Sequence, residues 1–310
     1  MPRKLMLNEH ANKTIAEVFE AFVFSQSAQG LSDSTLKSYG YHLHCISKHL
    51  NIHEPMEELS KSKIEAMIVS MRKSGLAHNS ISSYCRVLRT FLGWCKREGI
   101  DVPPMPPIKD KETVKDYYSD DELLRLLKRP GKKATFCEFR NWVIINFLLN
   151  SGCRASSLRN IQNRDVDLDA QQVVFRHNKN GKIQSIPLCS HMVSVLREYM
   201  GIRKGKPDDY LFCDQYGELL STNGLRLAVA KYNKARGVDK TSTHLFRHTF
   251  ARKYLVDCGG DAFMLQKLLG HSTLKMTKHY CAIYDADIAR NYDNFSPLAQ
   301  LTQQKSKLKR

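Results

Sequence analysis

A cluster of prolines near residue 105 divides the chain into two parts that cannot share one continuous helical structure. Pro103, Pro104, Pro106 and Pro107 stand together and are followed by a charged run. Proline fixes φ and lacks a backbone N–H, so this segment favours an extended tether over a helix. The length of 310 residues also exceeds that of a usual single domain. We therefore expect an N-terminal segment at 1–12, a first domain at 13–100, a linker at 101–116, a second domain at 117–295 and a basic tail at 296–310.

The first domain is predicted to be a four-helix unit, because its apolar residues recur at spacings of three and four. The first helix follows Thr14, a typical N-cap residue, and the third spans about 60–74. The fourth begins near Asn79 and ends before Gly99. The second helix follows Ser34, and the residues expected on its buried side are Leu36, Tyr39, Leu43, Ile46 and Leu50.

Hydroxyl, amide and basic side chains gather on the second and fourth of these helices. Side chains of these kinds contact DNA phosphates. For any one of them an ordinary solvated helix face is the simpler explanation, whereas the cluster favours a DNA-binding surface. The candidate DNA-binding residues are Lys37, Tyr41, His42, Asn79, Ser80, Ser83, Arg86 and Arg89.

The second domain is predicted to be mainly helical with a small β-sheet. Ser119 and Glu122 form a capping box in front of an apolar helix, and further helices are expected at about 136–150 and 221–236. Residues 172–177 and 182–188 are expected to pair as a β-hairpin, because Asn180-Gly181 is a strong turn signal. Lys179 is therefore predicted to lie at the tip of this hairpin.

Four polar residues in the second domain suit a single chemical task. Arg247, in the run His244-Leu245-Phe246-Arg247-His248, supplies a planar fork of donors that matches two phosphate oxygens. His244 lies three residues earlier, so on a helix the two side chains share a face. His271 follows Gly270 at a predicted helix end, and Tyr280 comes nine residues later.

The phenol of Tyr280 suits covalent catalysis. A tyrosine has a reference pKa of about 10 and is a good nucleophile only near cations, which an arginine and two histidines provide. A tyrosine that attacks a phosphodiester keeps the bond energy in a covalent link. The strand can then be rejoined without ATP, metal or another cofactor.

These motifs resemble those of the tyrosine recombinase, or phage-type integrase, family, and in particular its simple, Xer-like members. Arg154, in Ser151-Gly152-Cys153-Arg154-Ala155-Ser156, resembles the first catalytic arginine, and Lys179 resembles the β-hairpin lysine. The match covers nearly the whole chain. It implies an N-terminal core-binding, SAM-like domain and a catalytic domain that together form a C-shaped clamp on DNA.

The resemblance also implies a role for each residue of the set. Arg154 and Arg247 would hold the scissile phosphate, and Tyr280 would form a 3′-phosphotyrosyl link with release of a 5′-hydroxyl. Lys179 would protonate the leaving oxygen, His244 would assist proton transfer at the tyrosine, and His271 would hydrogen-bond a phosphate oxygen. His248 is expected to support or pack against these groups.

The sequence departs from the family at three positions. Ser157 stands where an acidic residue is usual, and Asn163 stands where tryptophan is often found. Phe246 replaces the usual leucine. None of these changes removes a group that performs chemistry, but the first two bear on how Arg154 is oriented.

The implied function is site-specific recombination of double-stranded DNA, in integration, excision, inversion or dimer resolution. The predicted start of the four-helix unit leaves no room for an arm-binding domain, which favours short inverted-repeat core sites. Strand exchange between two such sites needs four active sites, so a homotetramer on DNA is expected. The departures from the family and the cysteine count lean slightly towards a mobile-element enzyme.

Two alternatives come from other classes of protein. A type IB topoisomerase uses a similar set of residues, but the predicted four-helix domain argues against it. A DNA-binding regulator without catalysis is disfavoured because all six expected chemical groups are present. Taken singly, each of these residues is most often structural, and their shared order and spacing carry the interpretation.

Charge and cysteine content agree with a DNA-binding protein of a reducing compartment. The net charge is +17, with 13 basic and 9 acidic residues in 1–100 and 35 against 22 in 101–310. Such an excess favours a polyanionic partner, although it is also found on ordinary basic surfaces. The nine cysteines include no C-x-x-C pair, so we expect reduced thiols and no structural metal. No apolar run is long enough to span a membrane, and a cytoplasmic location is expected.

Overall fold

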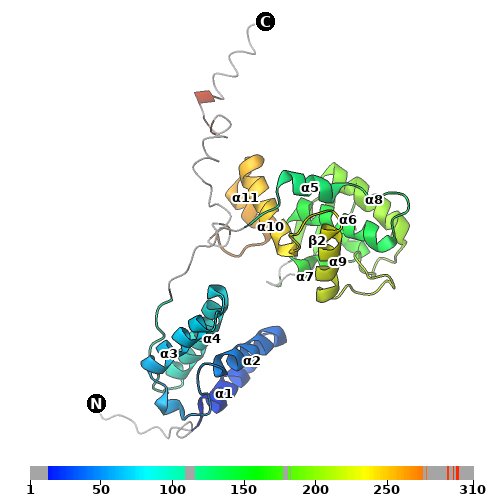
Figure 1. The fold of residues 1–310 in the computed structure, drawn as a ribbon. Coiled ribbons are helices and arrows are strands. Elements are labelled where there is room, and N and C mark those ends of the chain that lie inside the picture. The colour runs from blue at the N-terminus through cyan, green and yellow to red at the C-terminus, as the bar shows by residue number, and fades with distance from the viewer. Residues whose placement is uncertain are drawn as a thin grey trace. The chain divides into compact units, whose positions relative to one another are not determined.

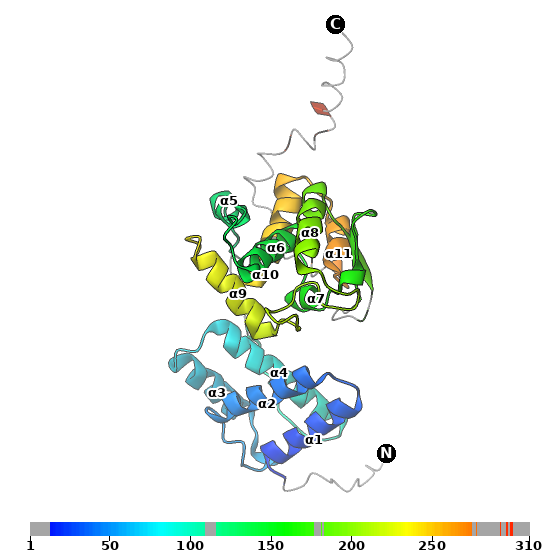
Figure 2. The ribbon, with the colours of Figure 1, turned by 90° about the vertical axis from the view of Figure 1, so that its right-hand side faces the viewer.

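The computed structural model describes residues 13–108, 116–176, 181, 183–274, 277, 292, 296, 298 and 299. The chain divides into two compact units, Met1–Thr113 and Val114–Arg310, and this division falls inside the predicted linker. Figures 1 and 2 show the helices of each unit from two sides. Lys179 and Tyr280 lie outside the described residues, as does the segment 1–12.

The first unit contains the four predicted helices, and their capping residues explain where they begin. They are α1 (Ile15–Ala28), α2 (Asp33–Ser47), α3 (Lys61–Lys73) and α4 (His78–Arg97), with a short 3₁₀ turn, η1 (Met56–Glu58), before α3. Thr14 Oγ1 accepts from the backbone N–H of Glu17 at 3.3 Å, while the Glu17 carboxylate accepts from the Thr14 N–H at 2.8 Å. This reciprocal capping satisfies two N–H groups that a helix start would otherwise leave unpaired.

The long helix α4 organises the core of the first unit, since it packs against α1, α2 and α3. Phe91 of α4 meets Phe19 and Phe22 of α1, with ring centroids 5.1 and 5.7 Å apart. Of the residues predicted on the buried side of α2, Ile46 is buried, as is Leu50 just beyond the helix end. Its partly buried apolar residues are Leu36, Tyr39 and Leu43. Helix α2 packs mainly against α1 and α4, and Tyr39 and Leu43 contact the buried core of this unit.

The second unit is built around α6 (Phe136–Ser151), which is buried on nearly every side. It packs against α5 (Asp120–Leu127), α8 (Ser190–Arg203), α9 (Thr222–Lys234) and α10 (Thr243–Arg252), as Figure 1 shows. The short helix α7 (Ala155–Arg159) follows α6 directly. The capping box predicted at Ser119 and Glu122 is confirmed.

A small antiparallel sheet completes this unit, as predicted. After a 3₁₀ turn, η2 (Asn163–Asp165), the strands β1 (Val166–Asp167), β2 (Gln172–Phe175) and β3 (Gln184–Pro187) pair in that order. Val173 lies opposite Ile186, and both side chains are buried in the main core. The predicted hairpin pairing is thus confirmed.

The last described helix is held by a small cluster of its own. After α10 the chain makes a π-helical turn, η3 (Lys253–Asp257), and then forms α11 (Ala262–Leu269). The buried members of this cluster are Ala251, Leu255, Val256, Leu265 and Leu269, apart from the main core. Because its apolar support is small, the polar contacts at the end of α11 matter for its position.

The start of the second unit is attached firmly to α10. The Tyr118 side chain is fully buried, and its ring lies against Phe246 with centroids 4.3 Å apart. Its backbone N–H donates to Thr249 Oγ1 at 3.0 Å, and its hydroxyl donates to the Lys240 carbonyl at 3.1 Å. Burial, the largest cause, raises the pKa of this phenol. The chain therefore enters the second unit along the helix that carries His244 and Arg247.

Candidate active site

Arg247 is a buried cation that ties together the ends of two helices. Its side chain extends from α10, and the residue is only 3% exposed. Nη1 donates to the Gly152 carbonyl and Nη2 donates to the Leu269 carbonyl, both at 2.9 Å. Carbonyls at helix C-termini lack partners within the helix and carry partial negative charge. The two helix ends therefore fix the guanidinium and offset part of the cost of burying it.

Both of these helices end at a glycine in the left-handed conformation. Gly152 closes α6 with φ of 57°, and Gly270 closes α11 with φ of 62°. A Cβ at residue 152 would lie 2.4 Å from Cδ1 of Phe250 and 3.0 Å from Cδ2 of Leu269. Glycine is therefore required at 152 both for its backbone angle and for the close approach of α10 and α11.

His271 directly follows this second glycine and contacts Arg247. Arg247 Nη2 lies 2.7 Å from His271 Nε2, and His271 Nδ1 lies 2.8 Å from Thr277 Oγ1. Because a guanidinium can only donate, Nε2 is the acceptor, and we assign the ring proton to Nδ1, which donates to the threonine hydroxyl. Both ring nitrogens are thus engaged within the protein, and His271 orients Arg247.

Arg154 lies at the mouth of the same site. It is the N-cap residue of α7, two residues after Gly152, and it is half-buried. Within the described part of the chain, its guanidinium makes no hydrogen bond or ion pair, in contrast to that of Arg247. Its N–H donors are therefore available to a ligand.

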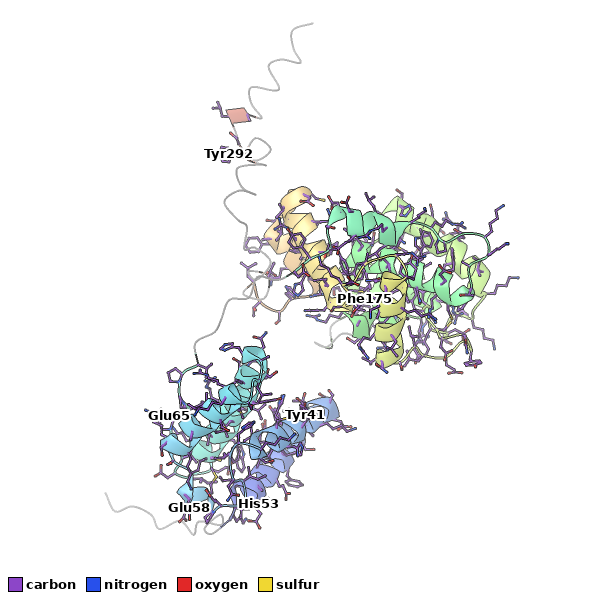
Figure 3. All side chains as sticks on the ribbon, in the orientation of Figure 1. Tyr41, His53, Glu58, Glu65, Phe175 and Tyr292 are labelled. Carbon is purple, nitrogen blue, oxygen red and sulfur yellow. The ribbon has the colours of Figure 1, made fainter. Side chains whose placement is uncertain are left out.

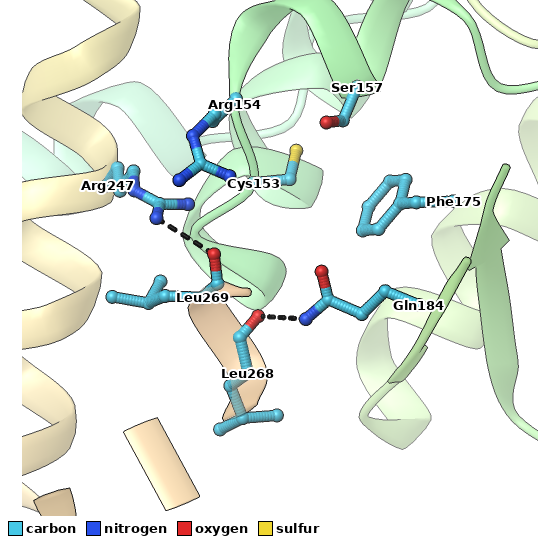
Figure 4. Close-up of a pocket in the computed structure, with 8 residues that line it drawn as sticks. All are labelled: Cys153, Arg154, Ser157, Phe175, Gln184, Arg247, Leu268 and Leu269. Atoms are coloured by element: carbon cyan, nitrogen blue, oxygen red, sulfur yellow. Dashed lines mark hydrogen bonds between the residues drawn. The ribbon is translucent and has the colours of Figure 1, made fainter. Parts of the chain in front are cut away.

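A hollow of about 190 Å³, open to solvent, brings the two arginines together (Figure 4). Its lining residues are Cys153, Arg154, Ser157, Phe175, Gln184, Arg247, Leu268 and Leu269. Burial, the largest cause, raises the pKa of the Cys153 thiol to about 11, so it stays protonated at neutral pH. The only formal charges among these lining residues are the two guanidinium groups, and the hollow is suited to an anion with several oxygens.

His244 lies on α10 one turn before Arg247 and is exposed. Its ring meets that of His248 edge to face, with centroids 4.5 Å apart. The structure thus brings Arg154, Arg247 and His271 into one site, with His244 exposed on the helix that carries Arg247. Lys179 and Tyr280 lie outside the described residues.

The two departures at 157 and 163 have different surroundings. Ser157 is 4% exposed and lines the hollow beside Arg154. Asn163 is remote from the lining and donates from Nδ2 to the Lys206 carbonyl at 2.7 Å. Among the residues that the structure describes, no carboxylate pairs with Arg154, so the usual acidic support is not replaced from elsewhere in that part.

Sequence reasoning did not identify Gln184, which also lines the hollow. Its side-chain amide donates to the Lys267 and Leu268 carbonyls at 2.6 and 2.9 Å. No local motif marks such a residue, because its partners lie more than eighty positions away.

The candidate DNA-binding residues of the first unit share a region with little acidic charge. Lys37, Tyr41, Asn79, Arg86 and Arg89 are exposed, and Tyr41 projects from α2 in Figure 3. Ser80 and Ser83 are half-buried. Helices α2 and α4 contain one acidic residue, Asp33, whereas α1 and η1 contain four, namely Glu17, Glu20, Glu57 and Glu58. The surface formed by α2 and α4 is therefore more basic than the one formed by α1 and η1.

His42 differs from the other candidates because it is partly withdrawn from solvent. Its ring lies edge to face against Tyr84, with centroids 5.3 Å apart. Burial lowers the pKa of His42 from its usual 6.5. It is therefore less positively charged near neutral pH than an exposed histidine would be.

No helix in the described part of the chain combines the length and apolar character needed to cross a membrane.

Comparison with known proteins gives a consistent result over both units. Residues 117–287 match the model of the phage integrase family, and residues 19–99 match that of the phage integrase N-terminal SAM-like domain. The tyrosine recombinase XerD of Oceanobacillus iheyensis is 28% identical over 293 residues, covering 90% of this chain and 97% of that protein. The tyrosine recombinase XerA of Thermococcus kodakarensis is 28% identical over 273 residues, covering 86% and 91%.

Solved structures share the fold. The Tn1549 transposon integrase in complex with a circular intermediate DNA matches with a TM-score of 0.76 at 20% identity, covering 92% of this chain and 100% of that one. A lambda integrase tetramer bound to a Holliday junction matches with a TM-score of 0.70 at 19% identity, covering 88% and 79%. At 19–20% identity, these two matches show a shared fold.

Proposed function

The chain belongs to the phage integrase family, and from this premise we propose how its own residues carry out the reaction. It is a tyrosine recombinase, an enzyme of site-specific recombination that cleaves and rejoins DNA strands through a covalent tyrosine intermediate.

We propose that Arg154 and Arg247 bind the scissile phosphate. The observation that carries this is the shared hollow, in which one guanidinium is buried and fixed while the other keeps its donors for a ligand. Charge builds on the non-bridging oxygens as the phosphorus is attacked, and donors held in place beforehand stabilise it most in the transition state. Loss of either arginine should therefore reduce cleavage more than DNA binding.

His271 is proposed to act through Arg247. Its Nε2 accepts from Nη2 while Thr277 holds Nδ1, so the ring sets the direction of the guanidinium. A direct contact between His271 and a phosphate oxygen would require it to give up the Arg247 contact and donate from Nε2. His244, exposed on the same helix, is proposed to take the proton of the attacking phenol.

Tyr280 and Lys179 complete the proposed reaction. The phenol oxygen of Tyr280 attacks phosphorus and forms the new P–O bond, and the bond from phosphorus to the 5′-oxygen breaks. Lys179 gives a proton to that oxygen, so the products are a 3′-phosphotyrosyl link and a 5′-hydroxyl. Attack by this hydroxyl on the link reverses each step and rejoins a strand. The support for both residues is their place in the family's motifs.

The basic surface of α2 and α4 is proposed to lie on DNA. Its exposed lysine and arginines can neutralise phosphates, and the acidic residues of α1 and η1 lie on other helices. We propose double-stranded DNA with short inverted-repeat core sites as the substrate and four copies of the chain on two sites. The lambda integrase tetramer on a Holliday junction supports this assembly by analogy of fold. A reducing compartment such as the cytoplasm is proposed, since every cysteine in the described part is a free thiol.

Covalent trapping tests the proposed nucleophile. A core-site duplex with a nick beside the cleavage position loses the short 5′-hydroxyl fragment after cleavage, so the protein–DNA adduct accumulates. Wild type should give a denaturation-resistant adduct, Tyr280→Phe should bind the same duplex without forming it, and Arg247→Lys should form it slowly. A full yield of adduct with Tyr280→Phe would refute the assignment of the nucleophile. DNA binding by wild type without any adduct would refute the proposed reaction.

A further inference from the structure

We propose that Gln184 is a positioning residue that couples the β2–β3 hairpin to the end of α11. Through this coupling the hairpin that carries Lys179 and the helix end that holds Arg247 and His271 keep a fixed relation to each other. The inference rests on the proposed role of Lys179 as the proton donor to the leaving oxygen.

The Gln184 amide makes a pair of hydrogen bonds with the end of α11. Nε2 donates to the Lys267 carbonyl at 2.6 Å and to the Leu268 carbonyl at 2.9 Å. Figure 4 shows the side chain reaching from β3 across the hollow to Leu268. The Lys267 carbonyl also accepts from the backbone N–H of Gly270 at 3.1 Å, so the Gln184 amide adds a second donor there and satisfies the Leu268 carbonyl as well. The hairpin therefore reinforces the backbone cap of α11 from outside the helix.

The Lys267 and Leu268 carbonyls lie next to a carbonyl that contacts Arg247. The next carbonyl along α11, that of Leu269, accepts from Arg247 at 2.9 Å. Three consecutive carbonyls of one helical turn are thus held by two side chains from different elements. Arg247 also keeps its contacts with the Gly152 carbonyl and His271, neither of which involves Gln184.

Gln184 also packs closely against the backbone at Gly270. A Cβ at Gly270 would lie 2.6 Å from Gln184 Oε1, and Gly270 already adopts φ of 62°. The glutamine side chain therefore packs directly over the glycine that precedes His271. Any side chain at 270 would displace Gln184 as well as straining the backbone.

The other strand of the hairpin is anchored separately. Arg176, the residue after β2, pairs through Nε with Asp165 Oδ1 at 2.7 Å. The Asp165 side chain is only 2% exposed, and its Oδ2 accepts from the Gln162 N–H at 2.9 Å. Lys179 follows Arg176 by three residues and precedes Gln184 by five. Arg176 and Gln184 are therefore anchored on the two sides of the turn whose sequence contains Lys179.

Anchoring of this kind is catalytically useful. A proton donor held near its target gains a large effective concentration, and a displacement of about 1 Å can cost about 10²-fold in rate. Gln184, which anchors one strand of this hairpin, is thus placed to affect proton transfer to the leaving oxygen.

The test compares two cleavable duplexes. One has the ordinary 5′-oxygen leaving group and the other has sulfur at that position. A thiol has a pKa of about 8.5 against about 15.7 for water, so a sulfur leaving group departs without protonation. A defect in proton donation is therefore relieved on the sulfur substrate, whereas a defect in phosphate binding by the arginines remains.

Three variants isolate the amide donors of Gln184. Gln184→Glu keeps the size but removes both N–H donors, and Gln184→Lys retains a donor that suits a helix C-terminus. The matched control is Ser185→Ala, which removes a hydrogen bond to Gln172 on the exposed face of the same strand and makes no contact with α11. Single-turnover cleavage and DNA binding are measured for each, and urea midpoints confirm that each variant is folded.

We expect Gln184→Glu to slow cleavage of the oxygen substrate roughly 10- to 100-fold and to recover most of that loss on the sulfur substrate. Ser185→Ala should cleave both substrates at rates within about threefold of wild type with unchanged DNA binding, and Gln184→Lys, which keeps one donor, should lose less activity on the oxygen substrate than Gln184→Glu. An equal loss on both substrates would restrict Gln184 to α11 and overturn the coupling. An unchanged rate would also overturn it.

Lys179→Ala separates this inference from the function on which it rests. If Lys179→Ala is relieved on the sulfur substrate while Gln184→Glu is not, the coupling is wrong and the acid assignment stands. If Lys179→Ala loses activity equally on both substrates, the acid assignment itself fails.

Discussion

Replacement of Gly152 by alanine should damage both the stability of the second unit and its active site. The added Cβ would lie 2.4 Å from Cδ1 and 2.9 Å from Cγ of Phe250, and 3.0 Å from Cδ2 of Leu269. These neighbours belong to α10 and α11, which are packed together, so neither ring nor leucine can move alone. Overpacking of this kind costs about 1–3 kcal/mol. The left-handed backbone at φ of 57° adds about 1–2 kcal/mol for a residue with a Cβ.

A total loss of about 2–5 kcal/mol is therefore expected in the free energy of unfolding. The same displacement shifts two acceptors of Arg247, the carbonyls of Gly152 and Leu269. We expect cleavage of a nicked core-site duplex to fall about 10²-fold even in the folded variant, as for other displacements of about 1 Å in an active site. Urea midpoints and single-turnover cleavage measure the two effects.

Two glycines in the same unit serve as controls. Gly201 lies within α8 at ordinary helical angles, and a Cβ there would meet nothing within 4 Å, so Gly201→Ala should stabilise the fold by about 1 kcal/mol. Gly217 has φ of 92° but equally open surroundings, so Gly217→Ala reports the cost of the backbone angle alone. If Gly152→Ala unfolds at the same urea concentration as Gly217→Ala and cleaves normally, the close approach of the three helices does not constrain the site.

Three further predictions concern other parts of the chain. Replacement of Arg86 and Arg89 by Gln should weaken DNA binding and lower the slope of log affinity against log salt concentration by about 0.9 for each lost phosphate contact. Lys61→Gln on α3 is the control. An unchanged slope would exclude these arginines from the DNA surface. The pKa of His42 is lowered in the folded state, so its contribution to stability is complete above pH 6.5 and is lost as the pH falls through the lowered value. His42→Phe should therefore reduce the drop in urea midpoint between about pH 7.5 and 5.5. A drop of the same size in the variant and in wild type would contradict this. Burial raises the pKa of the Cys85 thiol to about 11 and that of Cys95 to about 12. A thiol reagent at neutral pH should therefore modify the exposed Cys189 and Cys258 first, which peptide mass mapping can show. Early modification of Cys85 or Cys95 would indicate opening of the first unit.

Local signals predicted much of the fold. Thr14 and Ser119 have short-range capping partners three residues away, and each begins a helix in the structure. The β-hairpin is set by a turn signal between two apolar runs, and its strands pair as expected. In these cases the partners are close in sequence, so composition and spacing are sufficient.

Contacts between distant residues could not be read in the same way. The motif around Arg247 indicated a phosphate-binding arginine, but its burial depends on a carbonyl 95 positions away and on another 22 positions away. The role of Gln184 likewise depends on α11, and its own neighbourhood has no pattern that marks it. For α2, periodicity identified the apolar stripe of Leu36, Tyr39 and Leu43 but not how much of it the neighbouring helices would cover.

The attachment of Tyr118 to α10 gives the junction between the two units a mechanical meaning. A force transmitted along the chain from residue 116 first meets the contacts of Asp116 and Tyr117 with Lys240 and Arg252, and then the buried ring of Tyr118 with its two hydrogen bonds, to Thr249 and Lys240. Arg252, Thr249 and Phe246 among these contacts lie on α10, so this load is borne by the helix that positions Arg247. Work done on the linker is therefore delivered within one or two helical turns of the phosphate-binding groups.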